Sequence, residues 1–350
     1  MRADGGTVMI REALDALINQ ERHLTEDEAA AVMSEVMAGE TTPAQLGALL
    51  AALRLRGETV DEIAGMARIM RERALRVQHP GPLIDTCGTG GDGSGSFNVS
   101  TAAAFVAAAA GVPVAKHGNR AMSSGCGSAD VLEALGARIE LAPEGVAACI
   151  AESGFGFMFA QAFHPAMKHA APTRRDLGVR TVFNILGPLS NPAGAQAQVL
   201  GVPRPELVET MAAVLGRLGC RHALVVHGED GIDELTLAGP TLVCELKGET
   251  LSTYRITPQE AGLEPAPRAA VHGGAPADNA RTLRAVFEGR TGPIRDFVLL
   301  NAAAALVVGG AVANIAEGVT VAAKLIDTGA AGNAVDRFVT ATQRHAPVGE

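Results

Sequence analysis

The spacing of apolar residues divides the chain into a helical part and a part in which strands and helices alternate. Between residues 8 and 77 the apolar positions follow helical spacing, most clearly in the leucine-rich stretch 46–55. Three segments here carry a capping box, in which a threonine hydroxyl accepts from a free backbone N–H and a later Glu or Gln reaches back. The boxes begin at Thr25, Thr42 and Thr59. We therefore predict a small all-helical domain over residues 1–80.

After residues 80–82, which include two prolines, short apolar runs alternate with amphipathic ones. We expect strands over 82–86, 112–116, 138–141, 155–160, 196–202 and 222–227, and near 241–246. We expect helices over 98–110, 128–135, 143–152 and 205–218, and near 279–288, 297–316 and 333–343. Such alternation is typical of a parallel sheet covered on both faces. The predicted fold class is α/β: a small N-terminal all-helical domain plus a larger doubly covered, mostly parallel-sheet α/β domain over 81–350.

Charge and aromatic content disfavour two classes of partner. The 350 residues include 38 acidic and 29 basic side chains, for a net charge of −9, with one Tyr and no Trp. Such a chain is a poor match to nucleic acid or to an anionic membrane surface. The uncharged stretch 297–316 contains two Asn and a Gly-Gly pair, so we interpret it as a buried helix rather than a membrane span. We predict no nucleic-acid partner and no membrane association.

Cysteine usage bears on the cellular compartment. The five cysteines are odd in number and lack CxxC spacing, which disfavours a disulfide framework or a zinc site. The first residues show no apolar signal core. These features predict a cytoplasmic protein.

The stretch 85–120 carries the clearest chemical signal. A short apolar run leads into a loop with glycines at 88, 90, 91, 93 and 95, and an Ala-rich helix follows. Glycines let successive backbone N–H groups face a ligand, and a helix N-terminus favours an anion. A second strand then ends in Lys116, His117 and Arg120. We predict a phosphorylated ligand at this loop.

The loop allows other interpretations. Residues 88–93, GTGGDG, also satisfy the dinucleotide pattern GxGxxG. That pattern expects an acidic residue about 20 positions later for the ribose hydroxyls, where this chain has Lys116 and His117. A Walker A loop is excluded because no Lys-Ser or Lys-Thr pair follows the glycines. A glycine-rich surface turn without a ligand is the remaining alternative.

Two further polar clusters follow predicted strands. Residues 116–130, KHGNRAMSSGCGSAD, combine a basic strand end with serine-rich turns that suit a second phosphate group, although Ser128 is also a candidate helix cap. Residues 227–234, HGEDGIDE, gather four carboxylates, which repel one another unless a cation lies between them. Because Mg2+ binds a carboxylate or two together with phosphate oxygens, Asp233 and Glu234 suit a metal–phosphate complex. A solvated acidic loop is the alternative.

Three arginines form another candidate group. Arg174, Arg175 and Arg180 fall on a helix predicted to start near Thr173. A guanidinium offers a planar fork for a carboxylate, and the alternative is a set of arginines on a helix surface in water.

Taken together, these strings resemble the anthranilate phosphoribosyltransferases. The resemblance is carried by GTGGD, NVST, KHGNR, RRDLGVRTVFNILGPLSNP and the Asp-Glu pair at 233–234, and it extends over nearly the whole chain. It implies a homodimer formed through the helical domain, with two Mg2+ ions per monomer. It also implies that the helical segment near 173–190 joins the small domain in space.

The resemblance assigns roles to particular residues. It implies that 5-phosphoribosyl 1-diphosphate is held by Gly88, Gly91, Asp92, Ser96, Asn98, Val99, Ser100, Thr101, Lys116, His117, Gly118, Asn119, Arg120, Ala121, Met122, Ser123, Ser124 and Ser128. It implies that anthranilate is bound by Gly88, His117, Asn119 and Arg174, with Arg174 facing the carboxylate. It implies that Mg2+ is bound by Ser100, Asp233 and Glu234. Ser96 and the pair Gly125-Cys126 depart from the family pattern, in which Thr and a longer polar pair are commoner, so they bear on loop dynamics.

The implied reaction transfers the phosphoribosyl group to the amine of anthranilate and releases pyrophosphate, in L-tryptophan biosynthesis. It depends on electrostatic stabilisation and positioning, so we assign no residue as a discrete acid or base. Pyrimidine nucleoside phosphorylases resemble the same fold, but they are longer and lack GPLSNP. Nucleic-acid-binding relatives without transferase activity are a second alternative, and a basic exterior is expected of them. A nicotinamide-dependent oxidoreductase is the third.

Overall fold

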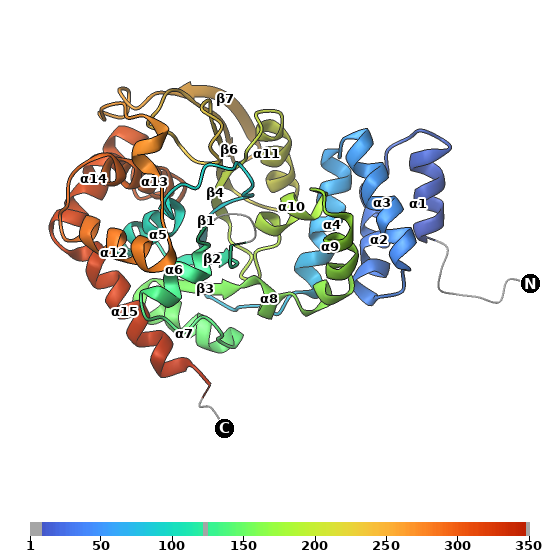
Figure 1. Ribbon diagram of the computed structural model, residues 1–350, viewed down its shortest axis with the longest axis horizontal. Coiled ribbons are helices and arrows are strands. Elements are labelled where there is room, and N and C mark those ends of the chain that lie inside the picture. Colours follow the sequence, from blue (N-terminus) through green and yellow to red (C-terminus); the bar gives the residue numbers. More distant parts are fainter. Residues whose placement is uncertain (1–8, 122–124, 348–350) are drawn as a thin grey trace, which may run out of the picture.

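The computed structural model describes residues 9–121 and 125–347. A helical bundle lies beside a larger α/β part (Figure 1). The α/β part is built on one seven-stranded sheet of order β3-β2-β1-β4-β5-β6-β7. Its strands are β1 (Ile84–Gly88), β2 (Val114–Gly118), β3 (Phe155–Phe159), β4 (Ala197–Gly201), β5 (His222–Gly228), β6 (Thr241–Lys247) and β7 (Thr250–Ile256).

The first five strands of this order run parallel. Strand β6 pairs antiparallel with β5, and β7 pairs antiparallel with β6. Four of the parallel strands, β1, β2, β4 and β5, end in glycine. In the β1–β4 pair, Gly88 lies beside Gly201. A Cβ atom on either of these two glycines would collide with Asp233. The loops that follow the strands therefore pack closely over the carboxyl edge of the sheet, where ligands of parallel sheets bind.

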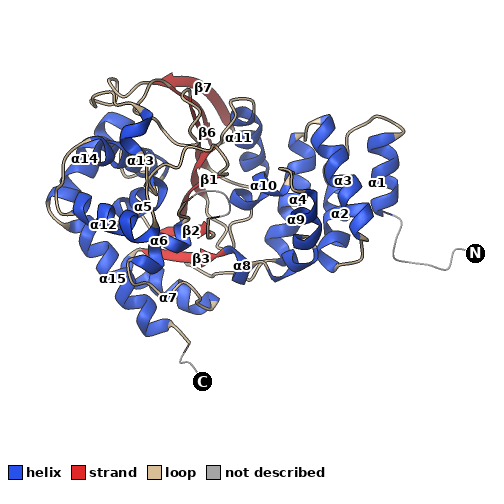
Figure 2. Cartoon of the chain, in the orientation of Figure 1, coloured by secondary structure: helices blue, strands red, loops and turns tan. Residues whose placement is uncertain are grey.

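Helices cover both faces of the sheet (Figure 2). On one face, α5 (Val99–Ala109) and α13 (Pro293–Val308) pack against it, and on the other α11 (Leu207–Arg217) does so. Successive residues of β5 face opposite sides: Leu224 and Val226 belong to the core around α5 and α13, whereas Val225 belongs to the core around α11. The remaining helices of this part are α6 (Ser128–Ala134), α7 (Pro143–Ser153), α8 (Ala160–Phe163), α10 (Phe183–Leu186), α12 (Pro276–Phe287), α14 (Ile315–Asp327) and α15 (Ala330–His345).

The helical bundle contains α1 (Met9–Ile18), α2 (Glu26–Ala38), α3 (Pro43–Arg56) and α4 (Val60–Arg73). The three predicted capping boxes are confirmed at the starts of α2, α3 and α4, where each threonine hydroxyl accepts from the backbone N–H three residues later. A later helix, α9 (Ala171–Leu177), packs against α3 and lies within the bundle (Figure 1). Its Thr173 and Leu177 side chains approach Gly47 of α3. The predicted fold class is confirmed.

Two predicted elements differ in the structure, and others were missed. Residues 138–141 form no strand, although Ile139 and Leu141 are buried. The predicted helix 297–316 ends early: α13 stops at Val308, because the chain turns at Gly309-Gly310, where Gly310 takes a φ of 72°. The helix α14, which begins at Ile315, was not predicted. Strand β7 was not predicted, since its face is mostly exposed and its apolar residues do not alternate.

The structure also bears on the predictions about membrane spans and disulfides. Within residues 9–121 and 125–347, none of the helices has the length and apolar character that crossing a bilayer demands. All five cysteines lie in the described part, where each is buried and none forms a disulfide.

Candidate active site

A cavity of about 640 Å3 opens at the carboxyl edge of the sheet. The glycine loop after β1, the end of β2, the start of α6 and the loop after β5 all line it. The structure therefore brings together the clusters predicted at the ends of separate strands. From the predicted substrate and metal sets, the cavity is lined by Gly88, Gly91, Asp92, Ser96, Asn98, Ser100, Thr101, Lys116, His117, Gly118, Asn119, Arg120, Ala121, Ser128, Asp233 and Glu234.

Three predicted residues cannot be placed, and two do not line the cavity. Met122, Ser123 and Ser124 lie outside the described residues. Val99 is fully buried at the start of α5 and belongs to the core. Arg174 lies on α9, stacked over the ring of Phe183 with 4.9 Å from its guanidinium carbon to the ring centroid.

The glycine loop is held open by its own backbone and by Asp233. The N–H of Gly90 donates to the Asp233 carboxylate at 2.8 Å. Gly91 has a φ of 78°, and a Cβ there would collide with the guanidinium of Arg180. Only glycine adopts this conformation at low cost. The close approach of Arg180 is a second reason why position 91 is a glycine. The hydroxyls of Thr89 and Thr101 line the cavity, buried and without a hydrogen-bond partner in the part of the chain that is described.

A buried lysine connects β1, β2 and α5 at the floor of the cavity. Lys116 is 2% exposed, and its ammonium donates to the Thr86 carbonyl and to the Ser100 hydroxyl, the latter at 3.2 Å. A buried ammonium needs such partners because its desolvation is costly. Lys116 thus places a positive charge where α5 begins, and the N-terminus of that helix also favours an anion.

Both carboxyl groups of the acidic pair Asp233 and Glu234 have raised pKa values. Asp233 is 7% exposed and Glu234 is 9% exposed. Burial and, second, the nearby Asp92 together raise the pKa of Asp233 to about 7. Burial and the neighbouring Asp233 hold the pKa of Glu234 well above its usual range. Clustered, desolvated carboxylates of this kind disfavour ionisation until a cation is present, so the donor set fits a divalent cation with hard oxygen ligands.

The other two carboxylates of the acidic loop do not belong to the site. Glu229 pairs with Arg255 at 2.6 Å on the surface, and Asp230 does not line the cavity. No group of three or more His, Cys, Asp and Glu side chains is arranged to hold a metal ion in the described ranges.

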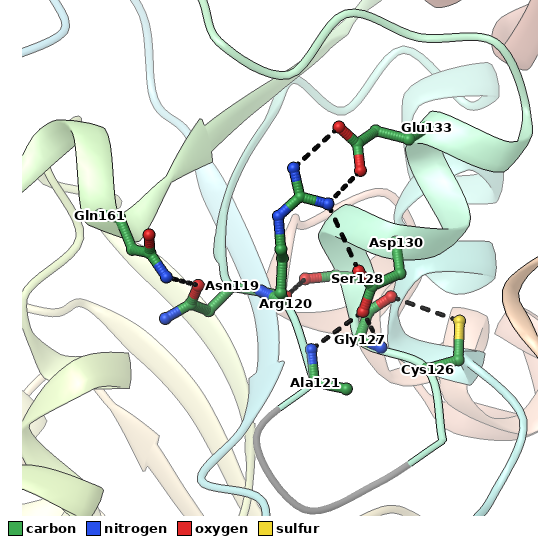
Figure 3. A network of polar contacts seen from close by, with 9 residues as sticks. All are labelled: Asn119, Arg120, Ala121, Cys126, Gly127, Ser128, Asp130, Glu133 and Gln161. Atoms are coloured by element: carbon green, nitrogen blue, oxygen red, sulfur yellow. Dashed lines mark hydrogen bonds and ion pairs between the residues drawn. The ribbon is translucent and has the colours of Figure 1, made fainter. Parts of the chain in front are cut away.

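Charged contacts hold Arg120, Ala121 and Gly127, which lie between β2 and α6 (Figure 3). The Asp130 carboxylate accepts from the backbone N–H groups of Ala121 at 2.9 Å and Gly127 at 2.8 Å. Arg120 forms a forked ion pair with Glu133, with one N–O distance of 2.9 Å. Ser128 does not cap α6: it is the first helical residue, and its hydroxyl donates to the Asn119 carbonyl at 3.4 Å. Asp130 therefore fixes both ends of the turn.

His117, which lines the cavity, packs against the ring of His164, which does not line it. The ring centroids of His117 and His164 lie 5.0 Å apart, and the Nε2 atom of each is buried without a partner in the described structure. Burial lowers the pKa of His117 to about 3 and that of His164 to about 4. Both rings are therefore neutral near pH 7, each with a free nitrogen. The sequence analysis missed His164, which follows the end of β3 without any recognisable motif.

The predicted arginine helix is shorter than expected. α9 ends at Leu177 and Gly178 turns the chain with a φ of 63°, so Arg180 lies beyond the helix. Its guanidinium donates to the Gly90 carbonyl at 2.8 Å. Arg174 remains on the helix, and burial lowers its pKa.

The C-terminal third adds a wall that the sequence analysis missed. His272, Gly273, Gly274 and Asn279 line the cavity. Asn279 donates to the Asn98 side chain at 2.8 Å and accepts from the Gly274 N–H at 2.7 Å. Asn98 in turn donates to the Cys126 carbonyl at 3.1 Å. These amides join three segments that are far apart in the sequence, which only the tertiary fold reveals.

This combination of a helical bundle, a mostly parallel sheet, a glycine loop and a buried acidic pair defines a class. Residues 80–332 match the family described as "Glycosyl transferase family, a/b domain", and residues 11–74 match "Glycosyl transferase family, helical bundle domain". The two matches cover the two parts of the structure, so the chain belongs to this class of glycosyl transferase.

Individual relatives narrow this class. The chain is 56% identical to the anthranilate phosphoribosyltransferase of Chloroflexus aggregans over 96% of its length and 99% of that protein, and 54% identical to that of Symbiobacterium thermophilum over 95% and 98%. The solved anthranilate phosphoribosyltransferase of Thermus thermophilus superposes with a TM-score of 0.90 at 50% identity, covering 96% and 99% of the two chains. The Saccharomyces cerevisiae enzyme in complex with PRPP and Mg superposes with a TM-score of 0.89 at 26% identity, covering 97% and 99%. The chain belongs to the anthranilate phosphoribosyltransferase family.

Proposed function

We propose that the protein transfers the phosphoribosyl group of 5-phosphoribosyl 1-diphosphate (PRPP) to the amine of anthranilate. The products are N-(5-phosphoribosyl)anthranilate and pyrophosphate, in L-tryptophan biosynthesis. The observation that carries the proposal is the convergence in one cavity of the glycine loop, Lys116 and the buried pair Asp233 and Glu234. Membership of the family supports the choice of both substrates.

We assign PRPP to the wall made by the glycine loop, the start of α5 and the segment after β2. The partnerless hydroxyls of Thr89 and Thr101 and the open glycine backbone offer donors for phosphate oxygens. The proposed binding set is the predicted one without the buried Val99 and with Thr89 added. Met122, Ser123 and Ser124 stay predictions from the sequence. Because the Arg120 guanidinium is paired with Glu133, we infer that Arg120 contributes to the site by shaping the loop.

We assign magnesium to Ser100, Asp233 and Glu234, with two ions per monomer. The raised pKa of Asp233 supports this, because a bound divalent cation would favour its ionised form. When bound, magnesium neutralises charge on the pyrophosphate oxygens. Lys116 adds a fixed positive charge on the same side, through its contact with Ser100.

We assign anthranilate to Gly88, His117, Asn119 and Arg174. The neutral His117 ring, with its free Nε2, offers a hydrogen bond without charge. The arylamine of anthranilate is unprotonated near pH 7, so it can attack the ribose C1 without a discrete general base. As the bond from C1 to pyrophosphate breaks, positive charge develops on the ribose, and the chain's task is to hold the two substrates in line.

We propose a homodimer formed through the helical domain, with domain limits of 1–80 and 81–350 and with the segment near 173–190 joined to the bundle. The packing of α9 on α3 supports that joining. Sedimentation at micromolar concentration tests the assembly: twice the mass of one chain is expected, and a monomer would overturn it. A cytoplasmic location stays a prediction from cysteine usage.

The reaction is tested by the fluorescence of anthranilate. A decay that requires the protein, PRPP and Mg2+ together is expected. Unchanged fluorescence with a folded protein would overturn the proposal.

A further inference from the structure

A second, smaller cavity lies beside the glycine loop. It has a volume of about 190 Å3 and is lined by the end of α3, the segment after α9 and the loop between β4 and α11. Three arginines, Arg54, Arg180 and Arg204, line it from these three places. The cavity is smaller than the ~300–1,000 Å3 typical of drug-sized ligands, so it suits a small ion rather than a nucleotide.

The charges of this cavity favour an anion. None of the three arginines has a carboxylate within 4.0 Å among residues 9–121 and 125–347. Thr181, which also lines the cavity, is 5% exposed, and its buried hydroxyl has no partner in the same residues. The acidic lining residues are Glu58 and Asp92, so the three arginines outnumber the two carboxylates. Asp92 also accepts from the N–H groups of Ser94 at 3.0 Å and Asp233 at 3.4 Å. The guanidinium groups of Arg54 and Arg204 and the Thr181 hydroxyl are donors of the kind that phosphate oxygens bind. Arg180 adds the N–H groups that it does not use on the Gly90 carbonyl.

The small cavity shares a wall with the substrate cavity. Gly91, Asp92, Arg180 and Asn184 line both. Arg180 lies directly behind Gly91 and donates to the Gly90 carbonyl at 2.8 Å. Arg180 therefore belongs to both cavities, whereas Arg54 and Arg204 line only the smaller one.

We propose that this cavity is a second anion site, which takes inorganic pyrophosphate after it leaves the glycine loop. The source of the anion rests on the proposed function, whereas the site itself does not. Because Arg54 belongs to the helical bundle and Arg204 to the α/β part, a bound pyrophosphate bridges the two parts.

The test is calorimetric titration of pyrophosphate into protein saturated with PRPP, with Mg2+ in excess of both and without anthranilate. PRPP blocks the main cavity, so one further pyrophosphate per chain is expected. The double variant Arg54→Gln/Arg204→Gln should bind it about tenfold more weakly or worse, because each lost charged hydrogen bond contributes on that scale. The double variant Arg221→Gln/Arg290→Gln removes the same charge from exposed positions that line neither cavity and should bind as the original does.

The outcomes distinguish whether the anion site exists from which anion fills it. Tighter binding of pyrophosphate than of orthophosphate supports the leaving product, and equal binding supports free phosphate as the ligand. Pyrophosphate that only displaces PRPP, or that binds the Arg54/Arg204 variant unchanged, overturns the site. PRPP affinity of that variant reports its folding, and if it is lost the single variants Arg54→Gln and Arg204→Gln carry the same test. Failure of the anthranilate assay with intact pyrophosphate binding would overturn only the proposed reaction.

Discussion

Asp233 and Glu234 are the residues on which burial and like charge act most strongly. Replacing them together, as Asp233→Asn with Glu234→Gln, removes the hard anionic ligands while keeping the side-chain shape. We predict that magnesium-dependent turnover falls by about a hundredfold or more, as measured by anthranilate fluorescence across a magnesium titration. Glu229→Gln, on the same loop but paired with Arg255 on the surface, is the matched control and should keep its rate. Near-normal rates in the double variant would remove the pair from the metal site.

Asp233 also gives stability a pH dependence. Its folded pKa of about 7 lies above the ordinary value of 3.8 for a free aspartate. The folded state therefore holds a proton that the unfolded state has lost between about pH 4 and 7, so this group makes the metal-free protein less stable as pH rises through that window. We predict that the Tm of metal-free Asp233→Asn falls less between pH 5 and pH 8 than that of the original chain. Identical Tm changes would contradict the raised pKa.

Arg174 lies over Phe183 and outside the large cavity, so its assigned role requires the site to close on the substrate. We predict that Arg174→Ala raises the anthranilate KM by about tenfold, the scale of one charged hydrogen bond, and reduces kcat. Arg175→Ala on the same helix, where the side chain is exposed, should change neither constant. Steady-state kinetics decides: if Arg174→Ala behaves like Arg175→Ala, Arg174 does not contact anthranilate.

At the scale of elements, the amide chain through Asn98 and Asn279 fixes three loops around the cavity. Asn279→Ala leaves the Gly274 N–H and the Asn98 side chain without their partners, so we predict a loss of about 1–3 kcal/mol of unfolding free energy together with a higher KM for PRPP. Chemical denaturation and steady-state kinetics measure the two effects. Asn333→Ala, at an exposed position of α15, is the control. An unchanged KM would make the amide chain purely structural.

Local sequence signals predicted most elements because each depends on nearby residues. The capping boxes of α2, α3 and α4 are complete within four residues. The glycine loop is recognised from its glycines alone, because they indicate a backbone with unusual conformational freedom. The errors have tertiary causes. Gly309-Gly310 ends α13 inside an uncharged run that reads as one helix, and β7 pairs only because β6 lies beside it. The wall contributed by Asn279 and the packing of His164 on His117 were missed because nothing local marks them.

At the scale of the molecule, an arginine joins the bundle to the α/β part. Arg71 of α4 donates to the Leu189 carbonyl at 2.6 Å and to the Leu218 carbonyl at 2.9 Å, and burial lowers its pKa. We predict that Arg71→Met lowers the unfolding free energy by about 2–4 kcal/mol, because two carbonyls lose a charged donor. Arg73→Met, which loses one exposed contact to Ser34, should cost much less. Equal denaturation midpoints for the two variants would contradict this role.

The most direct test of the account is the stoichiometry of the reaction in the purified protein. Anthranilate loss, followed by its fluorescence, and pyrophosphate release should be measured in the same sample with PRPP and Mg2+. We predict one pyrophosphate per anthranilate consumed, with both signals absent when any component is withheld. Pyrophosphate release that does not depend on anthranilate, or no consumption of anthranilate by the folded protein, would contradict the assigned reaction.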